Sequence, residues 1–448
     1  MYRSAIEQLQ QWKNRSNRKP LIIEGARQVG KTWLMKEFGR LEYQDTAYIN
    51  FDSNSRMAEI FASDLDVDRL ILGLELYLGR KIDSEHTLII FDEVQEVPRA
   101  LSSLKYFYEN APQYQIVCAG SLLGIALHQG TSFPVGKVDF LQLYPLSFSE
   151  FLMALDKKQF VDLVNAQDYT MVTNFRQTYI DALKYYYFVG GMPEAVQHFA
   201  DHKDFQEVRR IQKQILEAYE QDFSKHAPNE IVPRIRMLWN SIPSQLAKEN
   251  KKFIYGLVRE GARAKDYETA IMWLSDCGLV HKVSRVNSPG IPLKAYEDLK
   301  AFKLFLLDVG LLGCMTGIRQ QTLLDGNQLF TEFKGALTEQ YVCQQLKTIG
   351  GLGIYYYTND RGSCEIDFIA DTGEQIVPVE VKAEENLMAK SLRTYKDKFK
   401  PEVSVRTSMA DYRREEWMVN LPLYAIHNLV QVTSGARCST TEKNSQIP

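Results

Sequence analysis

Two glycines, a lysine and a threonine follow an apolar run near the start of the chain, in the segment PLIIEGARQVGKTWLMKEF. Their spacing fits G-x-x-x-x-G-K-[ST] between an expected strand and an expected amphipathic helix. Glycines let successive backbone N–H groups wrap phosphate oxygens at a helix N-terminus. Lys31 would neutralise the β and γ phosphates during catalysis, and Thr32 would coordinate Mg²⁺. The residues expected to contact the nucleotide here are Gly25, Ala26, Arg27, Gln28, Val29, Gly30, Lys31, Thr32 and Trp33.

Two acids end a second apolar strand, TLIIFDEVQEVP. We expect Asp92 to hold Mg²⁺ through water and Glu93 to polarise the water that attacks the γ-phosphate, which indicates hydrolysis beyond binding. The alternative is a strand that ends in a solvated acidic turn. A third strand, YQIVCAGSLLG, delivers Ser121 either beside the attacking water or as a helix cap. No N-K-x-D signature for guanine follows, which favours ATP.

A second group of polar residues lies near the other end of the chain. We expect a helix that carries Glu339, a strand CEIDFIAD with Glu365 and Asp367 on one face, and a strand IVPVEVKAEE with Glu380 and Lys382 on one face. Hairpin pairing can bring these side chains together. Phosphodiester hydrolysis needs carboxylates of this kind to hold Mg²⁺ or Mn²⁺, and a lysine to orient the water or offset developing charge.

The triplet Glu-x-Lys has little meaning alone, because it also occurs at Glu249-Asn250-Lys251 and Glu332-Phe333-Lys334. Its position after a helix acid and a hairpin acid is what makes it similar to the D...[DE]-x-K nuclease superfamily. That resemblance implies a restriction-endonuclease-like α/β domain in which Asp367 and Glu380 are metal ligands and Lys382 is the catalytic lysine. Glu339 would match the acid on the leading helix and complete the metal site. The same fold can also bind DNA or protein without cutting, and both alternatives stay open at this point.

The bulk composition is that of an ordinary globular protein. The 448 residues are 45% apolar and 24% charged, with a net charge of -3, so about three domains are expected and any nucleic-acid binding needs a local basic patch. The six cysteines are scattered, which argues against disulfides and structural zinc. We find no secretory signal and no membrane-length apolar run, and we expect a cytoplasmic protein.

The middle of the chain predicts helices, with a Gly190-Gly191 break. Residues 231–290 hold ten Lys or Arg against five Asp or Glu, in a pattern of helix, turn, helix and hairpin. This favours a winged-helix DNA binder, with phosphate contacts from Arg259, Arg263 and Lys265; the alternative is a packing module with an ordinary charged surface. Asp308 is expected to be a cap or turn residue.

The chain resembles prokaryotic ATP-binding proteins that join an AAA-type ATPase domain to a C-terminal nuclease-like domain of unknown function. The likeness lies in RKPLIIEGARQVGKTWL, IIFDEVQEVP, CAGSLLG, LYPLSFSEFL and YFVGGMPEAV. It implies an arginine sensor for the γ-phosphate just upstream of LYPLSFSEFL, where this chain has Gly136-Lys137. An AAA-type core often completes its site with an arginine from a neighbouring copy, which leaves a homo-oligomer open.

These observations predict an α/β protein with several domains. The expected segments are a P-loop AAA-type core with a parallel sheet (1–145), a helical lid (146–227), a winged-helix-like domain (228–325), a nuclease-like α/β domain (326–432) and a disordered tail (433–448). The expected function is an ATPase whose nucleotide state is coupled to DNA binding or cleavage by the C-terminal half. The alternatives are a nucleotide-regulated interaction protein with an inert nuclease fold, and a small-molecule kinase, which Glu93 as a water activator disfavours.

Overall fold

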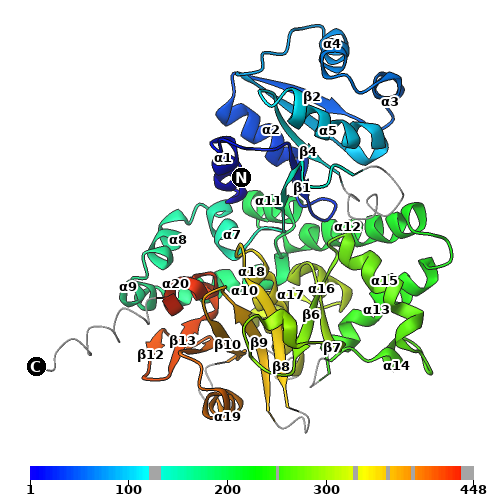
Figure 1. The fold of residues 1–448 in the computed structure, drawn as a ribbon. Helices are drawn as coiled ribbons and strands as arrows, with labels where there is room; N and C mark the ends of the chain where they lie inside the picture. Colours follow the sequence, from blue (N-terminus) through cyan, green and yellow to red (C-terminus); the bar gives the residue numbers. More distant parts are fainter. Residues whose placement is uncertain (121–132, 249–251, 326–330, 360–363, 385–388, 435–448) are drawn as a thin grey trace, which may run out of the picture. The chain divides into compact units, whose positions relative to one another are not determined.

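The computed structural model describes residues 1–120, 133–248, 252–325, 331–359, 364–384 and 389–434. The chain forms two compact units (Figure 1). One unit comprises residues 2–144 and 272–279, and the other comprises Met1 with the remainder of the chain. No helix in the described ranges combines the length and the apolar character that a membrane span requires.

The first unit is built on a parallel sheet in the order β2-β3-β4-β1-β5, which confirms the predicted sheet. All residues of the interior strand β3 are buried, as expected for a parallel strand covered on both faces. The strands are β1 (Leu21–Glu24), β2 (Asp45–Asn50), β3 (Thr87–Asp92), β4 (Gln115–Ala119) and β5 (Asp139–Gln142). The helices are α1 (Ala5–Lys13), α2 (Lys31–Glu42), α3 (Ser55–Ser63), α4 (Val67–Leu78), the 3-10 turn η1 (Val94–Glu96) and α5 (Pro98–Asn110).

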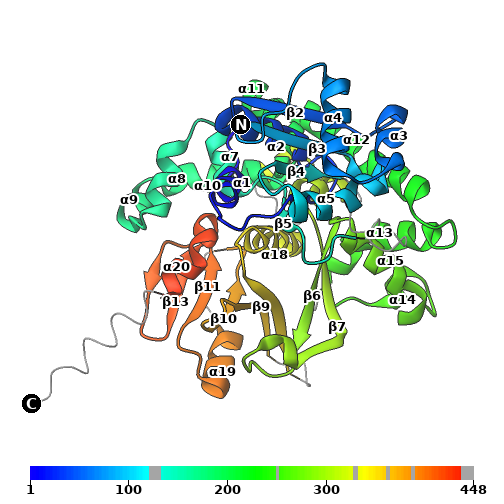
Figure 2. The same ribbon diagram turned by 45° about the horizontal axis from the view of Figure 1, so that its top comes forward.

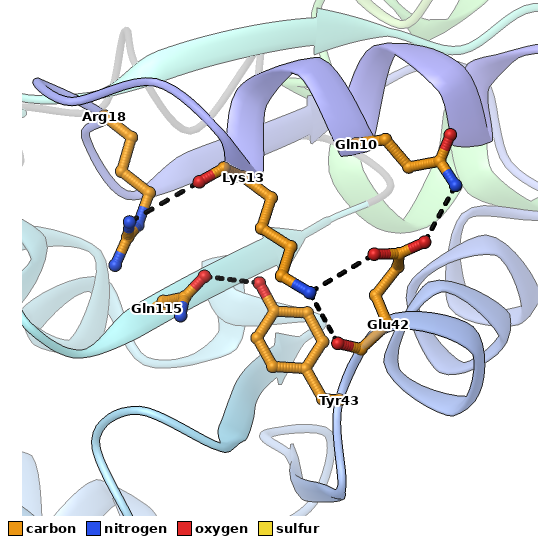
Figure 3. Close-up of polar contacts among 6 residues, drawn as sticks. All are labelled: Gln10, Lys13, Arg18, Glu42, Tyr43 and Gln115. Carbon is orange, nitrogen blue, oxygen red and sulfur yellow. Dashed lines mark hydrogen bonds and ion pairs between the residues drawn. The ribbon is translucent and has the colours of Figure 1, made fainter.

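Polar contacts fasten α1 to the end of α2 (Figure 3). Lys13 donates to the Glu42 carbonyl at 2.5 Å and pairs with the Glu42 carboxylate at 3.2 Å. Gln10 donates to the other Glu42 oxygen at 2.8 Å, and Tyr43 donates to Gln115 on β4 at 2.5 Å. Because α2 follows directly on the predicted nucleotide loop, these contacts fix the far end of the helix that carries Lys31 and Thr32.

The second unit begins with a run of helices. Ser147 and Glu150 form a reciprocal capping box at the first of them, and the chain after α10 turns at Gly190 with φ +73°. Asp308 caps α16 through the Leu311 N–H, as its predicted role requires. The helices are α7 (Phe148–Ala154), α8 (Lys158–Asn165), α9 (Tyr169–Asn174), α10 (Arg176–Val189), α11 (Pro193–His202), α12 (Phe205–His226), α13 (Val232–Leu246), α14 (Tyr255–Val258), α15 (Ala264–Asp276), α16 (Val309–Met315), α17 (Gln320–Asp325), α18 (Thr331–Lys347), α19 (Lys390–Phe399) and α20 (Leu429–Ser434). The end of α15, from residue 272 onward, belongs to the first unit.

An eight-stranded mixed sheet forms the centre of this unit, in the order β12-β13-β11-β10-β9-β8-β6-β7. The helix α18 is followed by β8, β9 and β10 and then by α19 and β11, so the expected helix with Glu339 and the expected strands with Asp367 and Glu380 are present in that order. The strands and 3-10 turns are β6 (Val280–Val286), η2 (Leu293–Tyr296), β7 (Glu297–Leu306), β8 (Gly353–Thr358), β9 (Glu365–Asp371), β10 (Ile376–Val381), β11 (Ser404–Ser408), β12 (Arg413–Arg414), β13 (Met418–Pro422) and η4 (Leu423–Asn428).

The hairpin of β6 and β7 extends this sheet. β6 pairs in parallel with β8, with Ser284 opposite Tyr355, and antiparallel with β7. The hairpin that the sequence pattern assigns to a winged-helix-like segment is therefore continuous with the C-terminal strands.

The two faces of the eight-stranded sheet carry different helices. Ile366 on β9 packs with Leu392 and Tyr395 of α19. The helix α18 packs against β7 and β10 (Figure 2). Since side chains alternate along a strand, Glu365 and Asp367 point away from the Ile366 face, toward the side that carries Glu339 of α18.

Candidate nucleotide site and acidic cluster

The loop between β1 and α2 has the backbone that its motif predicts. Gly25 adopts φ +147°, and a Cβ at this position would lie 2.3 Å from the Leu143 carbonyl oxygen, so only glycine fits. Gly30 adopts φ +94° immediately before the first residue of α2. The loop therefore leads into a helix N-terminus that no side chain of the described residues caps, the arrangement that binds phosphate.

Lys31 is buried at the start of α2. Its ammonium donates to the carbonyl oxygens of Gly25 and Ala26 at 2.9 and 2.8 Å. Burial lowers the pKa of Lys31 to about 8 despite the opposing charges of Glu93 and Asp92, and the nearby Arg27 adds a smaller effect in the same direction as burial. A buried cation whose hydrogen-bond partners are neutral carbonyls is poised to gain from an anion.

Thr32 and Asp92, the two residues of this unit expected to serve Mg²⁺, are in direct contact. The Thr32 hydroxyl donates to Asp92 Oδ2 at 2.8 Å. Tyr48, which the sequence interpretation missed, donates its hydroxyl to the same oxygen at 2.9 Å. The only sequence signal for Tyr48 is a polar ring in the strand TAYINFDS, on the opposite face from the buried Ala47 and Ile49.

Glu93 directly follows β3 in a left-handed backbone conformation, with φ +52°. Its N–H donates to Asp92 Oδ1 at 3.2 Å, and Gln95 donates to Glu93 Oε2 at 2.7 Å. The turn thus separates the two carboxylates, since Asp92 is buried beside Thr32 and Glu93 is half-buried and held by Gln95.

Ser121 and Lys137 are the other two residues that the sequence analysis considers for this site. Ser121 lies outside the described residues. Lys137 comes just before β5, and Asp139 of β5 pairs with Leu21 at the start of β1. Lys137 therefore lies at the opposite end of the sheet from the nucleotide loop, which follows Glu24 at the end of β1. Four strand residues separate the two ends by about 13 Å. Lys137 pairs there with Glu109 at 3.0 Å.

In the second unit, Glu339 and Asp367 come together around a residue that the sequence interpretation did not select. Lys303, on β7, has a fully buried side chain. Its ammonium lies 2.6 Å from Glu365 Oε1, 3.6 Å from Glu339 Oε2 and 4.0 Å from Asp367 Oδ1. We call these four side chains the acidic cluster. Burial opposes the charge on Lys303, but the three carboxylates outweigh it and raise the pKa of Lys303 above its usual range.

Glu380 and Lys382 form a separate pair at 2.8 Å on β10 and just beyond it. Glu380 is buried and Lys382 is one-third exposed. Asp367 connects them to the cluster, because its Oδ2 accepts the Val381 N–H at 2.8 Å. Within the described parts of the chain, no group of three or more His, Cys, Asp or Glu side chains is arranged as a metal site.

The basic residues expected to contact DNA lie around the turn between α14 and α15. Arg259, Arg263 and Lys265 are all exposed. The Arg263 N–H is capped by Asp266 at 3.1 Å, which fixes the turn while leaving the basic side chain at the surface.

A parallel sheet with a glycine-bounded loop, a buried lysine and a Thr–Asp pair defines a P-loop nucleotide-binding unit. Residues 17–152 match the family model described as "AAA domain". The first unit is therefore an AAA-type P-loop ATPase domain. Residues 180–322 and 334–426 match two models described as domains of unknown function, DUF8612 and DUF4143.

A search of curated proteins gave no match. Similar solved structures include the Walker-type ATPase PABY2304 of Pyrococcus abyssi, with 14% identity, 69% of this chain and 94% of that chain covered, and a TM-score of 0.43. The Aeropyrum pernix ORC1 protein in complex with DNA has 12% identity, coverages of 70% and 90%, and a TM-score of 0.26. Drosophila ORC bound to DNA has 15% identity, coverages of 71% and 96%, and a TM-score of 0.24. At these TM-scores the likeness supports no inference about function.

Proposed function

We propose that the protein binds and hydrolyses ATP with Mg²⁺, and that its nucleotide state governs binding of the C-terminal half to DNA. The observation that carries the ATPase proposal is the 2.8 Å contact between Thr32 and Asp92 beside the buried Lys31. Two side chains from separate motifs would have no reason to converge there if the glycine loop were an incidental turn.

The residues present suit a magnesium nucleotide. Thr32 and Asp92 supply the oxygen donors that Mg²⁺ prefers, and Lys31 supplies a buried positive charge at a helix N-terminus. Held by Thr32 and Asp92, Mg²⁺ would supply positive charge to offset the charge of the phosphates. Glu93 then polarises the attacking water, Gln95 orients Glu93, and Tyr48 holds the Asp92 carboxylate.

The ATPase proposal is tested by separating binding from turnover. Glu93→Gln keeps the size of the side chain but removes the base, so hydrolysis should fall by about 10²-fold or more while ATP binding stays. Glu96→Gln is the matched control, because Glu96 is exposed one turn further on and should leave turnover unchanged. Lys31→Ala should abolish binding. Unchanged hydrolysis in Glu93→Gln or Lys31→Ala would refute the assignments, and turnover that requires an acceptor would favour a kinase.

The DNA part of the proposal is supported by the exposed Arg259, Arg263 and Lys265 in a region of positive charge. The coupling is measured by fluorescence anisotropy of labelled duplex DNA titrated with the Glu93→Gln variant. The affinity for DNA in the presence of ADP is compared with the affinity in the presence of ATP. Replacing Arg263 and Lys265 by alanine should weaken binding and reduce its salt dependence. Lys213→Ala removes an exposed lysine from α12 and serves as the control. Equal affinity in both nucleotide states would contradict the coupling.

We restrict the proposed output to binding. DNA cleavage, the other outcome expected from the sequence, requires a metal among Glu339, Asp367 and Glu380. The first two of these carboxylates lie against the ammonium of Lys303.

A further inference from the structure

Lys303 is an unusual residue for its strand. It interrupts the apolar run AFKLFLLD of β7, and the residues on either side of it, Phe302 and Leu304, are buried. A lysine side chain with no exposed surface is rarely tolerated unless an opposite charge accompanies it. Its three partners come from two other elements: Glu339 from α18, and Glu365 and Asp367 from β9.

The position of the ammonium is the position that a catalytic cation would need. Glu339 and Asp367 are two of the three acids that the sequence analysis predicts as metal ligands. The ammonium of Lys303 lies within 4.0 Å of both. A divalent cation binds carboxylate oxygens at about 2.0 to 2.2 Å and keeps several waters. It would have to share this site with the fully buried ammonium of Lys303, which already lies 2.6 Å from Glu365.

The other predicted ligand also has an internal partner. Glu380 Oε1 pairs with Lys382 at 2.8 Å, so both lysines near the site neutralise carboxylates. The second oxygen of Asp367 accepts the backbone N–H of Val381 at 2.8 Å. Glu365 keeps about a quarter of its side chain exposed, so water screens the negative charge that Lys303 does not balance.

We infer that Lys303 is the resident cation of the acidic cluster, and that this site takes neither Mg²⁺ nor Mn²⁺ and does not hydrolyse phosphodiesters. The cluster keeps the acids of a metal nuclease but uses an ammonium to join β7, β9 and α18. It is a structural ion cluster in a domain that can bind without cutting. This inference does not depend on the ATPase proposal, since it concerns residues of the second unit only.

Manganese binding to the full-length protein without nucleotide tests the inference. Wild type, titrated with Mn²⁺ to millimolar concentrations in calorimetry and in thermal denaturation, should give the same binding and the same Tm shift as Glu339→Gln and Asp367→Asn. Comparison with these two variants cancels any Mn²⁺ that binds at Thr32 and Asp92. Binding that falls tenfold or more in either variant would overturn the inference.

Removing the charge of Lys303 should create a measurable Mn²⁺ response. Lys303→Met leaves the acids without their cation, so Mn²⁺ should raise the Tm of this variant more than that of wild type. Lys282→Met is the control, because Lys282 is exposed on the neighbouring strand β6. Its response to Mn²⁺ should match that of wild type.

A cleavage assay completes the test and remains decisive if Lys303→Met does not fold. Wild type with plasmid or single-stranded DNA and Mn²⁺ should give no product above that of Asp367→Asn. Cleavage by wild type that is lost in Asp367→Asn or Lys382→Ala would show a working metal centre and refute the role given to Lys303. ATP turnover can fail or succeed independently of this result.

Discussion

ATP binding should weaken as the pH rises through 8, because the phosphates need Lys31 in its charged form. Burial lowers the pKa of Lys31 to about 8 in the nucleotide-free protein. Phosphate oxygens beside the ammonium would raise this pKa again, so the bound state stays protonated across the range. Above pH 8, binding must therefore take up a proton.

The size of the effect follows from the pKa. At pH 7 about nine in ten Lys31 side chains are charged, and at pH 9 about one in eleven is, so affinity should fall about tenfold between them. The phosphates of ATP contribute little to this slope, because their last ionisation lies at about pH 6. Calorimetry in two buffers of different ionisation enthalpy should also give about half a proton taken up at pH 8.

Lys31→Arg is the matched control. A guanidinium does not titrate in this range, so the variant should bind ATP with an affinity that does not depend on pH between 7 and 9. A flat profile in wild type, or the same slope in Lys31→Arg, would refute the reasoning about Lys31.

Three further predictions concern stability. Gly25→Ala should destabilise the first unit by about 1 to 3 kcal/mol, because φ is +147° and the new Cβ would lie 2.3 Å from the Leu143 carbonyl oxygen. Gly335→Ala, in open space within α18, should instead stabilise the protein by about 0.5 to 1 kcal/mol. Measuring the Tm of both variants compares the two effects. Asp308→Ala should cost about 3 kcal/mol in denaturant unfolding, because two buried N–H groups and a side-chain amide lose their acceptor, and an unchanged midpoint would contradict this. Burial lowers the pKa of His281 to about 3, so the unfolded chain binds more protons below pH 6.5 and stability falls by about 2 kcal/mol by pH 5. His281→Phe should flatten this part of the Tm-against-pH curve, and an unaltered curve would exclude His281 as its source.

The nucleotide loop can be read from the sequence because its chemistry is contiguous. Gly25, Gly30, Lys31 and Thr32 lie on one strand–loop–helix segment, so local spacing alone places them. Tyr48 could not be found in this way. It reaches Asp92 from a strand 44 residues earlier, through a pairing of β2 with β3 that periodicity does not specify.

The C-terminal strands illustrate a second limit. The alternation in CEIDFIAD correctly places Glu365 and Asp367 on one face, but it says nothing about what lies opposite them. The neighbour is the hairpin of β6 and β7, which joins this sheet through parallel pairing with β8. The one local clue was Lys303 itself, since a lysine within the apolar run AFKLFLLD requires a buried carboxylate that local sequence cannot identify.

Lys31 and Lys303 show how one residue type separates a binding site from a structural one. Both are buried, but Lys31 donates to neutral carbonyl oxygens and has its pKa lowered, whereas Lys303 lies among three carboxylates that raise its pKa. A ligand anion gains most where the protein has left a cation incompletely neutralised, and a ligand cation gains least where the protein already supplies one. The same reasoning therefore favours phosphate at Lys31 and argues against a metal at Lys303. Adding an acid near Lys31 should weaken phosphate binding there, and removing Lys303 should allow a metal to bind the acidic cluster.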